Sequence, residues 1–401
     1  MQQPILIALI RERKNPPDNR VALTPVQCVA LKNRFSKIEI IVESCATRCF
    51  SDEAYEEVGI EVRTDVSTAD IMLGIKEVPK EFLIPQKTYL FFSHTIKKQP
   101  YNQLLLKEII KKQIRLIDYE VLKWETGQRV LGFGRFAGIV GAYNGFLTYG
   151  RKTGLFHLNP AWLSIDYSEI LSNALSIKLP PIKIALTGGG RVANGALDFL
   201  RSMRIKEVTP QQFLSVQYSQ PVFVHLNSPD LYCHPEKTNW DTHHFYNHHN
   251  EYQSSFDSYT RVTDILMNGI YWTKDLPALF SKEDTAREDF QIKVIADISC
   301  DVDGSVPITY DATSIQNPVI GWDKINQIPC KPFTENSIDV MAVGNLPNEL
   351  PKDASEEFGE LMLQHVLPAL FADKSALIEK ATICVNGNLT DNFNYLTDYI
   401  A

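Results

Sequence analysis

Ionisable side chains follow several apolar runs in the first third of the chain. Lys76 ends ADIMLGIK, His94 ends KTYLFFSH and Glu120 ends IRLIDYE. Arg20 lies in the loop after the first run, and Arg129 begins RVLGFG, which is predicted to be the next strand. Ligands of parallel α/β sheets bind beyond the carboxyl ends of strands, so we expect these side chains to lie together. Lysine and histidine can move protons, and arginine can bind a carboxylate bidentately, so the set predicts chemistry on a carboxylate-bearing substrate.

Each of these residues alone also fits a structural role. A lysine or arginine at a strand end is most often a solvated charge, and a histidine after two phenylalanines is more often a satisfied core residue. The presence of all five at neighbouring strand ends favours a site.

A glycine-rich turn in the middle of the chain predicts a dinucleotide. Residues 182–200 read IKIALTGGGRVANGALDFL, a strand, a G-x-G-x-x-A turn at Gly188, Gly190 and Ala193, and then a helix. Glycines there let a pyrophosphate approach the backbone, and the helix N-terminus faces it with free N–H groups. The alternative is a glycine-rich turn of an ordinary α/β domain. The expected cofactor contacts are Gly188, Gly189, Gly190, Arg191, Val192, Asn268, Gly269, Asp297 and Ile298.

The choice between NAD and NADP depends on the strand after this helix. An acid at its end would bind ribose hydroxyls and favour NAD. That strand is predicted to end near KEVTP, where Glu207 is the only acid and Thr209 lies at the tip. Arg191 in the loop is able to meet a 2′-phosphate. The pattern favours NADP and leaves both cofactors open.

Strand and helix patterns alternate twice, which predicts an α/β fold of two Rossmann-like domains with mostly parallel sheets separated by a cleft. We expect residues 1–135 plus 350–401 to form a discontinuous substrate and catalytic domain, and residues 136–349 a dinucleotide-binding domain. The C-terminal stretch shows two helical patterns, ASEEFGELMLQHVLPAL and KSALIEKATICV, without a strand series, so it should return to the first domain. Two crossings, near Phe136 and Asn345, would make a hinge.

Local signals refine two helices. Thr24 followed by Pro25 predicts an N-cap and a helix start. Gly138, Gly141 and Gly145 recur on one face of FAGIVGAYNGFLTYG, which predicts close packing of that helix.

Composition restricts the possible partners. The 401 residues carry a net charge of −8, which disfavours nucleic acid and anionic membranes. The six-residue run ILIALI is too short to span a membrane and lacks a basic leader. Seven cysteines at irregular spacings predict free thiols and a cytoplasmic location. We expect small-molecule partners, an amino acid and a 2-oxo acid, and the oligomeric state stays open.

A histidine-rich segment, HPEKTNWDTHHFYNHHNEY, contains His234, His243, His244, His248 and His249. His244 and His248 are four apart, as helical metal ligands would be. The segment is polar and lacks H-E-x-x-H, so a solvated loop without metal is the expected structure, and a metal site is the alternative.

Ordered motifs along the whole chain resemble one family. They are RERKNPPDNRVALTP, GIKEVPK, KTYLFFSHTIKKQ, IRLIDYE, RVLGFGRFAG, TGGGRVANGA, LMNGIYW, DISCDVDGSVP and NLPNELPKDAS. They are similar to those of the lysine-forming saccharopine dehydrogenases and of the lysine–ketoglutarate reductase domain of bifunctional aminoadipic semialdehyde synthases. The wider superfamily includes alanine dehydrogenase and transhydrogenase N-terminal domains. The sequence carries no second catalytic domain, so we expect the stand-alone reductase half.

The resemblance implies a reaction and its residues. The ε-amine of lysine condenses with 2-oxoglutarate, and the imine takes a hydride from NAD(P)H to give saccharopine, or the reverse occurs. The family's catalytic residues fall on Lys76 and His94, its substrate-binding arginines on Arg20 and Arg129, and neighbouring acids on Glu77 and Glu120. Burial or nearby positive charge would lower the pKa of Lys76, whereas Glu77 would oppose this change.

One position departs from the family. Gly344 in AVGNLPNELP stands where the family usually carries an aspartate, so the substrate pair and the direction of the reaction stay open. Two other functions are compatible with the sequence: a different amino-acid dehydrogenase, such as one acting on alanine, and a non-catalytic dinucleotide-binding sensor.

Overall fold

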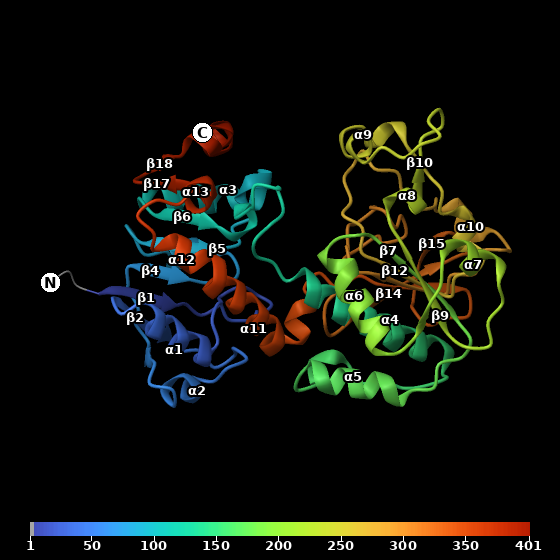
Figure 1. Cartoon of the computed structure of the whole chain (residues 1–401), viewed down its shortest axis with the longest axis horizontal. Coiled ribbons are helices and arrows are strands. Elements are labelled where there is room, and N and C mark those ends of the chain that lie inside the picture. The colour runs from blue at the N-terminus through green and yellow to red at the C-terminus, as the bar shows by residue number, and fades with distance from the viewer. Residues whose placement is uncertain (1–3) are drawn as a thin grey trace. The chain divides into compact units, whose positions relative to one another are not determined.

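The computed structural model describes residues 4–401 and divides into two compact units. Unit 1 comprises the chain up to Phe133 together with Pro351–Ala401, and unit 2 comprises Gly134–Leu350. The chain therefore passes between the units twice (Figure 1). Across residues 4–401, no helix combines the length and apolarity needed to cross a bilayer.

Unit 1 contains an eight-stranded sheet in the order β18-β17-β6-β5-β4-β1-β2-β3. Its strands are β1 (Ile5–Leu9), β2 (Ile38–Glu43), β3 (Glu61–Arg63), β4 (Ile71–Leu73), β5 (Thr88–Phe91), β6 (Arg115–Asp118), β17 (Thr382–Val385) and β18 (Asn388–Leu389). Strands β1 to β6 are parallel, whereas β17 and β18 extend the sheet antiparallel. The order 3-2-1-4-5-6 is that of doubly wound sheets, whose order reverses between β1 and β4.

Helices cover this sheet and bury its apolar faces. They are α1 (Pro25–Arg34), α2 (Asp52–Glu56), α3 (Pro100–Lys111), α11 (Pro351–Leu361), α12 (Leu367–Leu370), α13 (Ala376–Ala381) and α14 (Thr397–Ile400). Side chains alternate across β1, so Ile7 and Leu9 join one core cluster and Ala8 the other. Phe358 and Met362, from the C-terminal segment, belong to the same cluster as Ile7, so this segment completes the core of unit 1.

The start of α1 is as predicted. Thr24 caps the helix: its hydroxyl accepts from the Gln27 N–H, and the Gln27 side chain accepts from the Thr24 N–H. Pro25 occupies the first turn, where a backbone N–H would lack a helical partner.

Two predictions of secondary structure in unit 1 are wrong. KSALIEKATICV is not one helix, because α13 ends at Ala381 and Thr382–Val385 forms β17. RVLGFG is not a strand, and Arg129 forms only an isolated bridge with Lys123. Strand β17 is rich in β-branched and apolar residues and pairs with β6, so the sheet continues from β6 to β17 and not to RVLGFG.

Unit 2 also contains an eight-stranded sheet, in the order β15-β14-β16-β13-β12-β7-β9-β8. Its strands are β7 (Lys183–Thr187), β8 (Lys206–Glu207), β9 (Val222–Leu226), β12 (Ile265–Asn268), β13 (Val294–Asp297), β14 (Val319–Asp323), β15 (Ile328–Cys330) and β16 (Ser337–Met341). Only β14 and β15 are antiparallel. Both sheets are therefore mostly parallel, and the predicted α/β class with two Rossmann-like domains is confirmed.

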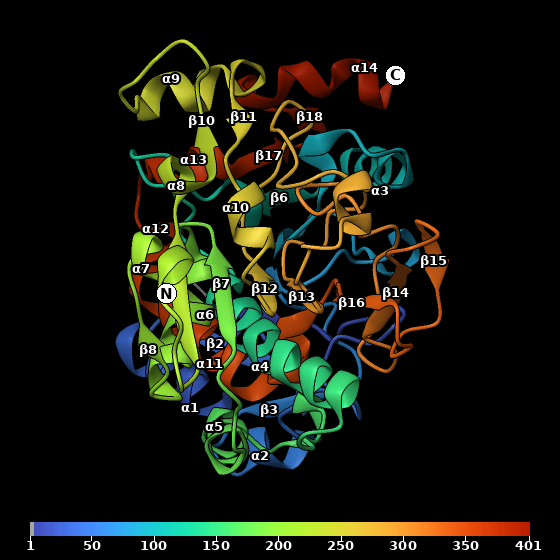
Figure 2. The same ribbon diagram turned by 90° about the vertical axis from the view of Figure 1, so that its right-hand side faces the viewer.

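The helices of unit 2 are α4 (Gly134–Thr153), α5 (Tyr167–Ser176), α6 (Arg191–Ser202), α7 (Pro210–Ser215), α8 (Ser228–Leu231), α9 (Thr242–Asn247) and α10 (Asp257–Thr260). A two-stranded ribbon of β10 (Tyr232–Cys233) and β11 (Gln253–Ser254) stands apart from the main sheet. Figure 2 shows α9 beside this ribbon. The histidine segment is mostly exposed, as predicted, but it is not a plain loop, because it contains α9 and its Phe245 and Tyr252 are buried in the core of unit 2.

The glycine stripe of α4 packs as predicted. A Cβ at Gly138 would lie 1.9 Å from the Val192 carbonyl oxygen of α6, and one at Gly141 would lie 2.6 Å from the Ile298 side chain. A Cβ at Gly145 would lie 3.1 Å from the Ala296 Cβ of β13. Only glycine therefore lets α4 approach α6 so closely.

We expect Gly138→Ala to destabilise the protein by about 1–3 kcal/mol, the usual cost of overpacking against rigid backbone. The midpoint of urea unfolding, at unchanged m-value, measures this loss. Gly190→Ala is the matched control, because a Cβ at Gly190 meets nothing within 4 Å. Equal stability of both variants would show that the backbone contact is not limiting.

Candidate functional site

The loop after β4 carries Lys76 and is held by a carboxylate that the sequence analysis missed. Both oxygens of Glu12 accept backbone hydrogen bonds, from the Ile75 N–H at 2.6 Å and the Lys76 N–H at 2.9 Å. Burial, with a contribution from Asp18, raises the pKa of Glu12 to about 7. Since Glu12 follows β1 and Lys76 follows β4, the pair lies where the strand order of unit 1 reverses.

The environment of Lys76 lowers its pKa. Burial of the half-buried ammonium contributes most, and the positive charge of Arg20 adds to the effect. Asp18 and Glu77 oppose the shift, as the sequence analysis expected for Glu77, but do not cancel it. A lysine with a lowered pKa is better suited to exchange protons near neutral pH.

Arg20 is buried with a partner. Its Nε lies 2.9 Å from Asp18 Oδ1, its guanidinium also contacts Oδ2 at 2.5 Å, and it stacks over the Phe133 ring at 4.1 Å. Burial alone would raise the pKa of Asp18, but Arg20 outweighs it and lowers this pKa to about 2. The carboxylate fixes the guanidinium geometry, which suits recognition of an anionic group.

His94 lies between two glutamates. It directly follows Ser93 after β5 and adopts a left-handed backbone conformation with φ of +52°. Its Nδ1 is 3.3 Å from Glu120 Oε2, and its Nε2 is 3.9 Å from Glu77 Oε1. The ionised Glu120 carboxylate places the proton of neutral imidazole on Nδ1, so Nε2 is the basic nitrogen.

Cations keep both glutamates ionised. Arg129 donates to Glu120 Oε1 at 2.6 Å, and Lys14 donates to Glu77 Oε2 at 2.7 Å. Although burial opposes the shift, hydrogen bonding to His94 and the charge of Arg129 lower the pKa of Glu120 to about 2. Lys14 likewise lowers the pKa of Glu77 against the effect of burial. Within residues 4–401, the buried Glu77 Oε1 has no hydrogen-bond partner, and His94 Nε2 lies 3.9 Å from it.

Another acid, Asp118, holds the backbone at Ser93 and Glu120 in place. Asp118, the last residue of β6, accepts from the Ser93 N–H at 3.2 Å and the Glu120 N–H at 2.7 Å, and also bonds the Ser93 hydroxyl. Burial raises the pKa of Asp118 to about 6 although the Ser93 hydroxyl bond opposes this. The ends of β5 and β6 are thereby tied together, which fixes His94 relative to Glu120.

Unit 1 therefore brings together Lys76, Glu77, His94, Glu120 and Arg129, with Arg20 beside Lys76, as the sequence predicted. Glu12, Lys14, Asp18 and Asp118 were missed. Three of these four lie in the loop RERKNPPDNR, where the sequence analysis named only Arg20. The high density of charged residues in this loop was the signal that could have indicated them.

Glu12 predicts a pH dependence of stability. Its pKa is higher in the folded protein than in an unfolded chain, so it favours folding below about pH 4.5 and loses this contribution as pH rises to about 7. We expect the unfolding free energy of the wild type, relative to that of Glu12→Gln, to fall over that range by at most about 1.4 kcal/mol per pH unit. Urea unfolding of both proteins at several pH values measures it; a constant difference would contradict the raised pKa.

The glycine loop of unit 2 has the geometry that a pyrophosphate needs. Gly188 has φ of +106°, and a Cβ there would lie 2.6 Å from the Gly269 carbonyl oxygen. Gly190 is the N-cap of α6, and a Cβ there meets nothing within 4 Å. The open space lies at the helix N-terminus, where an anion is stabilised, so the loop fits the dinucleotide that the sequence predicts.

A buried polar network lies at the ends of the neighbouring strands. The Asn268 amide donates to Asp297 Oδ1 at 2.8 Å and to the Ser305 hydroxyl at 2.8 Å, and accepts from the Thr187 hydroxyl at 2.8 Å. Thr309 donates to Asp297 Oδ2 at 2.6 Å. Burial raises the pKa of Asp297 despite these hydrogen bonds. The network connects β7, β12 and β13 beneath the loop.

Three other predicted contacts are also placed. Arg191 is exposed on the first turn of α6, and the Val192 carbonyl packs against Gly138. The Ile298 side chain packs against Gly141, which leaves its backbone as the part able to meet a cofactor.

The prediction that the strand ending near KEVTP would bring the ribose-binding residue to the glycine loop is wrong. The strand beside β7 is β9 and not the predicted strand at KEVTP, because β8 lies at the sheet edge beyond β9. Glu207 on β8 instead pairs with Arg201 at 2.8 Å, and Thr209 caps α7. The end of β9 brings His225, whose Nε2 is 2.7 Å from the Gly188 carbonyl oxygen, and then Asn227 to the loop. Sequence reasoning missed both.

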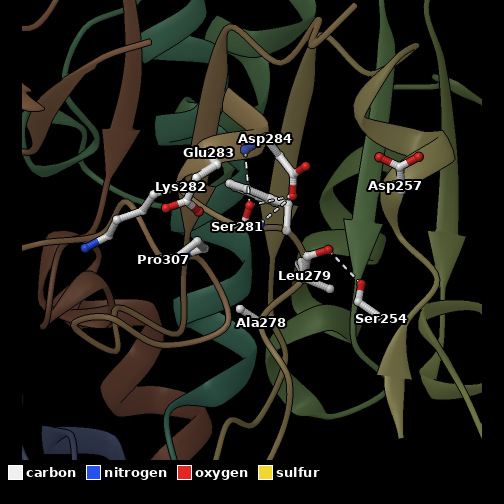
Figure 3. A pocket seen from close by; sticks show the side chains of 10 residues that line it. Ser254, Asp257, Ala278, Leu279, Ser281, Lys282, Glu283, Asp284 and Pro307 are labelled. Atoms are coloured by element: carbon white, nitrogen blue, oxygen red, sulfur yellow. Dashed lines mark hydrogen bonds between the residues drawn. The ribbon is translucent and has the colours of Figure 1, made fainter. Parts of the chain in front are cut away.

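Unit 2 also contains a broad pocket of about 660 Å³ that contains none of the predicted site residues. Figure 3 shows its lining, which includes Ser254, Asp257, Lys282, Asp284 and Pro307. Two of its acids, Asp257 and Asp284, are already paired with Arg287. We assign it no role.

Comparisons with known proteins find relatives similar to this chain in sequence and in fold. The family "Alanine dehydrogenase/PNT, N-terminal domain" matches residues 8–140. The "Alpha-aminoadipic semialdehyde synthase" of Arabidopsis thaliana is 28% identical over 98% of this chain, and the mitochondrial one of Mus musculus is 29% identical over 98%. The "Saccharopine dehydrogenase [NAD(+), L-lysine-forming]" of Yarrowia lipolytica is 26% identical over 92% of this chain and 93% of its own length. This chain is similar in sequence to these proteins over nearly its whole length, and residues 8–140 match the alanine dehydrogenase/PNT N-terminal family.

The matches cover 41% and 47% of the two synthases, so this chain spans less than half the length of those relatives. Among solved structures, an L-alanine dehydrogenase superposes with a TM-score of 0.66 at 15% identity, over 99% of this chain and 100% of the other. A transhydrogenase from Sinorhizobium meliloti superposes with a TM-score of 0.62 at 13% identity, over 96% of this chain and 100% of the other. These likenesses concern the fold.

Proposed function

We propose that this chain is an NAD(P)H-dependent oxidoreductase that joins lysine and 2-oxoglutarate through a reduced imine to form saccharopine, or carries out the reverse reaction. The polar cluster at the ends of β4, β5 and β6 carries this proposal. It combines a lysine of lowered pKa with a histidine held between two carboxylates and with arginines that are able to bind a dicarboxylate. The homologues named as lysine-forming saccharopine dehydrogenases supply the substrate class.

Imine formation requires protons to move on and off the condensing amine and the departing water. His94 Nε2 is the base of the neutral imidazole, and Glu120 stabilises the imidazolium that forms when it takes a proton. Lys76 Nζ exchanges the other proton that imine formation requires, and its lowered pKa aids this exchange. Arg20 and Arg129 hold carboxylates of the substrates, and Glu77 Oε1 accepts from the substrate amine. The loop at Gly188 and Gly190 would hold the dinucleotide, whose nicotinamide would supply the hydride.

Residues 1–135 plus 350–401 are accordingly proposed as the substrate domain and residues 136–349 as the dinucleotide domain. Within the latter, Arg191 favours NADP, and the end of β9 offers Asn227 rather than an acid to the ribose. Both cofactors therefore belong in the assay.

Following the absorbance of NADH or NADPH during turnover tests the proposal. We expect oxidation with lysine plus 2-oxoglutarate and little with pyruvate plus ammonia. The converse result would favour the second candidate, an alanine dehydrogenase, which the N-terminal family match supports. No oxidation with either pair, in a protein that still binds NAD(P)H, would favour a dinucleotide sensor.

A further inference from the structure

The histidine segment of unit 2 forms a small, well-anchored substructure. The ribbon of β10 and β11 closes its two ends, and α9 and the 3-10 turn His249–Glu251 lie between them. The Phe245 ring lies 4.8 Å from Trp240 and 5.0 Å from Tyr252. Figures 1 and 2 both place α9 beside β10. Packing among these aromatic rings therefore anchors the segment that carries the polar side chains.

Three of these side chains converge on one point. His234 Nε2 and His244 Nε2 each lie 3.4 Å from Glu251 Oε2, and the three atoms all lie within 4.8 Å of one another. Zinc bound to imidazole nitrogen at about 2.0–2.1 Å in a tetrahedron separates its ligands by about 3.3 Å. Two edges of the triangle already have this length, and the third, between the two imidazoles, is at most 4.8 Å and would shorten through rotation of the His244 side chain.

Neighbouring groups orient both rings. The Tyr252 hydroxyl lies 3.2 Å from His244 Nδ1, so the second nitrogen of that ring has a polar partner, as in many metal sites. His234 Nδ1 accepts from the N–H groups of Glu236 and Lys237 at 3.1 and 3.2 Å. Its side chain is only 9% exposed, which limits its rotation. In the neutral ring the proton is then on Nε2. Metal binding at Nε2 would move this proton to Nδ1, and the N–H groups of Glu236 and Lys237 would then turn to water.

We propose that His234, His244 and Glu251 bind one divalent transition-metal ion of the zinc type. Two imidazoles and one carboxylate supply the nitrogen and oxygen donors that such ions prefer over magnesium or calcium. Water completes the fourth position. The ion links β10, α9 and the turn before β11, so it stabilises this part of unit 2. The proposal is independent of the proposed reaction, whose residues lie elsewhere in the sequence.

The test uses the full chain, freed of metal with a chelator and titrated with Co²⁺. We expect saturation at one equivalent, with the visible absorption of four-coordinate Co²⁺, displacement by Zn²⁺, and a rise in the melting temperature with Zn²⁺. His244→Asn and Glu251→Gln should each weaken binding by at least about tenfold. His243→Asn is the matched control, because His243 is exposed on the same helix and lies outside the cluster.

Several outcomes would overturn the proposal: no Co²⁺ bound by the wild type, unchanged affinity in Glu251→Gln, or equal loss in His243→Asn. Cys233 is an exposed thiol next to His234, so Cys233→Ser is included, and loss of binding there alone would assign the metal to the thiol. Glu251 is 44% exposed, so Glu251→Gln should fold even if His244→Asn does not. Retained NAD(P)H binding by each variant verifies that unit 2 is intact.

Discussion

Replacing His94 by asparagine should lower kcat by about two to four orders of magnitude, the usual contribution of one general acid–base group. The imidazole is held by Glu120 at 3.3 Å with Nε2 directed to the Glu77 side, and no other histidine takes part in the cluster within residues 4–401. Asparagine is the best replacement, because residue 94 has φ of +52°, a conformation that asparagine tolerates. The variant should therefore fold.

The effect should fall on kcat more than on KM, because the arginines that hold substrate carboxylates are unchanged. Affinity for NAD(P)H, measured by fluorescence titration, should stay within about twofold of the wild type, because the glycine loop is in unit 2. His365→Asn is a matched control in unit 1, where His365 packs edge-on against Trp124. Wild-type kcat in His94→Asn would remove His94 from the mechanism, whereas equal loss in His365→Asn would indicate a general disturbance of unit 1.

The fold class could be predicted because periodic apolar runs and glycine turns are local signals. The α1 cap at Thr24, the glycine stripe of α4 and the turn at Gly188 are all confirmed, since each depends on residues within a few positions of one another. The errors concern pairing between distant segments. The sequence of TICV does not reveal that it pairs with β6 on one side and β18 on the other, and these pairings make it a strand.

The same limit explains the errors around the cofactor site. Strand β9, and not β8, lies beside β7, and this order is a property of the whole sheet that no local motif encodes. His225 and Asn227 consequently replace Glu207 next to the loop. In the candidate catalytic site, residues at strand ends were predicted, but Glu12 and Asp118 were not, because their role is to accept backbone N–H groups of other loops.

Gly190→Val should lower the affinity for NAD(P)H by about a hundredfold or more, or about 2.7 kcal/mol, without unfolding the protein. Residue 190 has φ of −87° and ψ of −172°, an extended conformation that valine favours. A Cβ there meets nothing within 4 Å, so the isopropyl group would enter the open space in front of the α6 N-terminus. That is the space in which a pyrophosphate would accept the helix N–H groups.

The comparison with Gly138→Ala separates binding from packing. In Gly138→Ala the new Cβ would lie 1.9 Å from the Val192 carbonyl oxygen, so this variant should lose stability. Gly190→Val, in contrast, should keep the wild-type urea midpoint and lose cofactor affinity. Gly190→Ala should lie between wild type and valine in affinity, because one methyl group fills less of the same space. Fluorescence titration with NADH and NADPH provides the affinities. Undiminished affinity in Gly190→Val, with a normal urea midpoint, would place the dinucleotide away from this loop and remove the basis for assigning unit 2 as the cofactor domain.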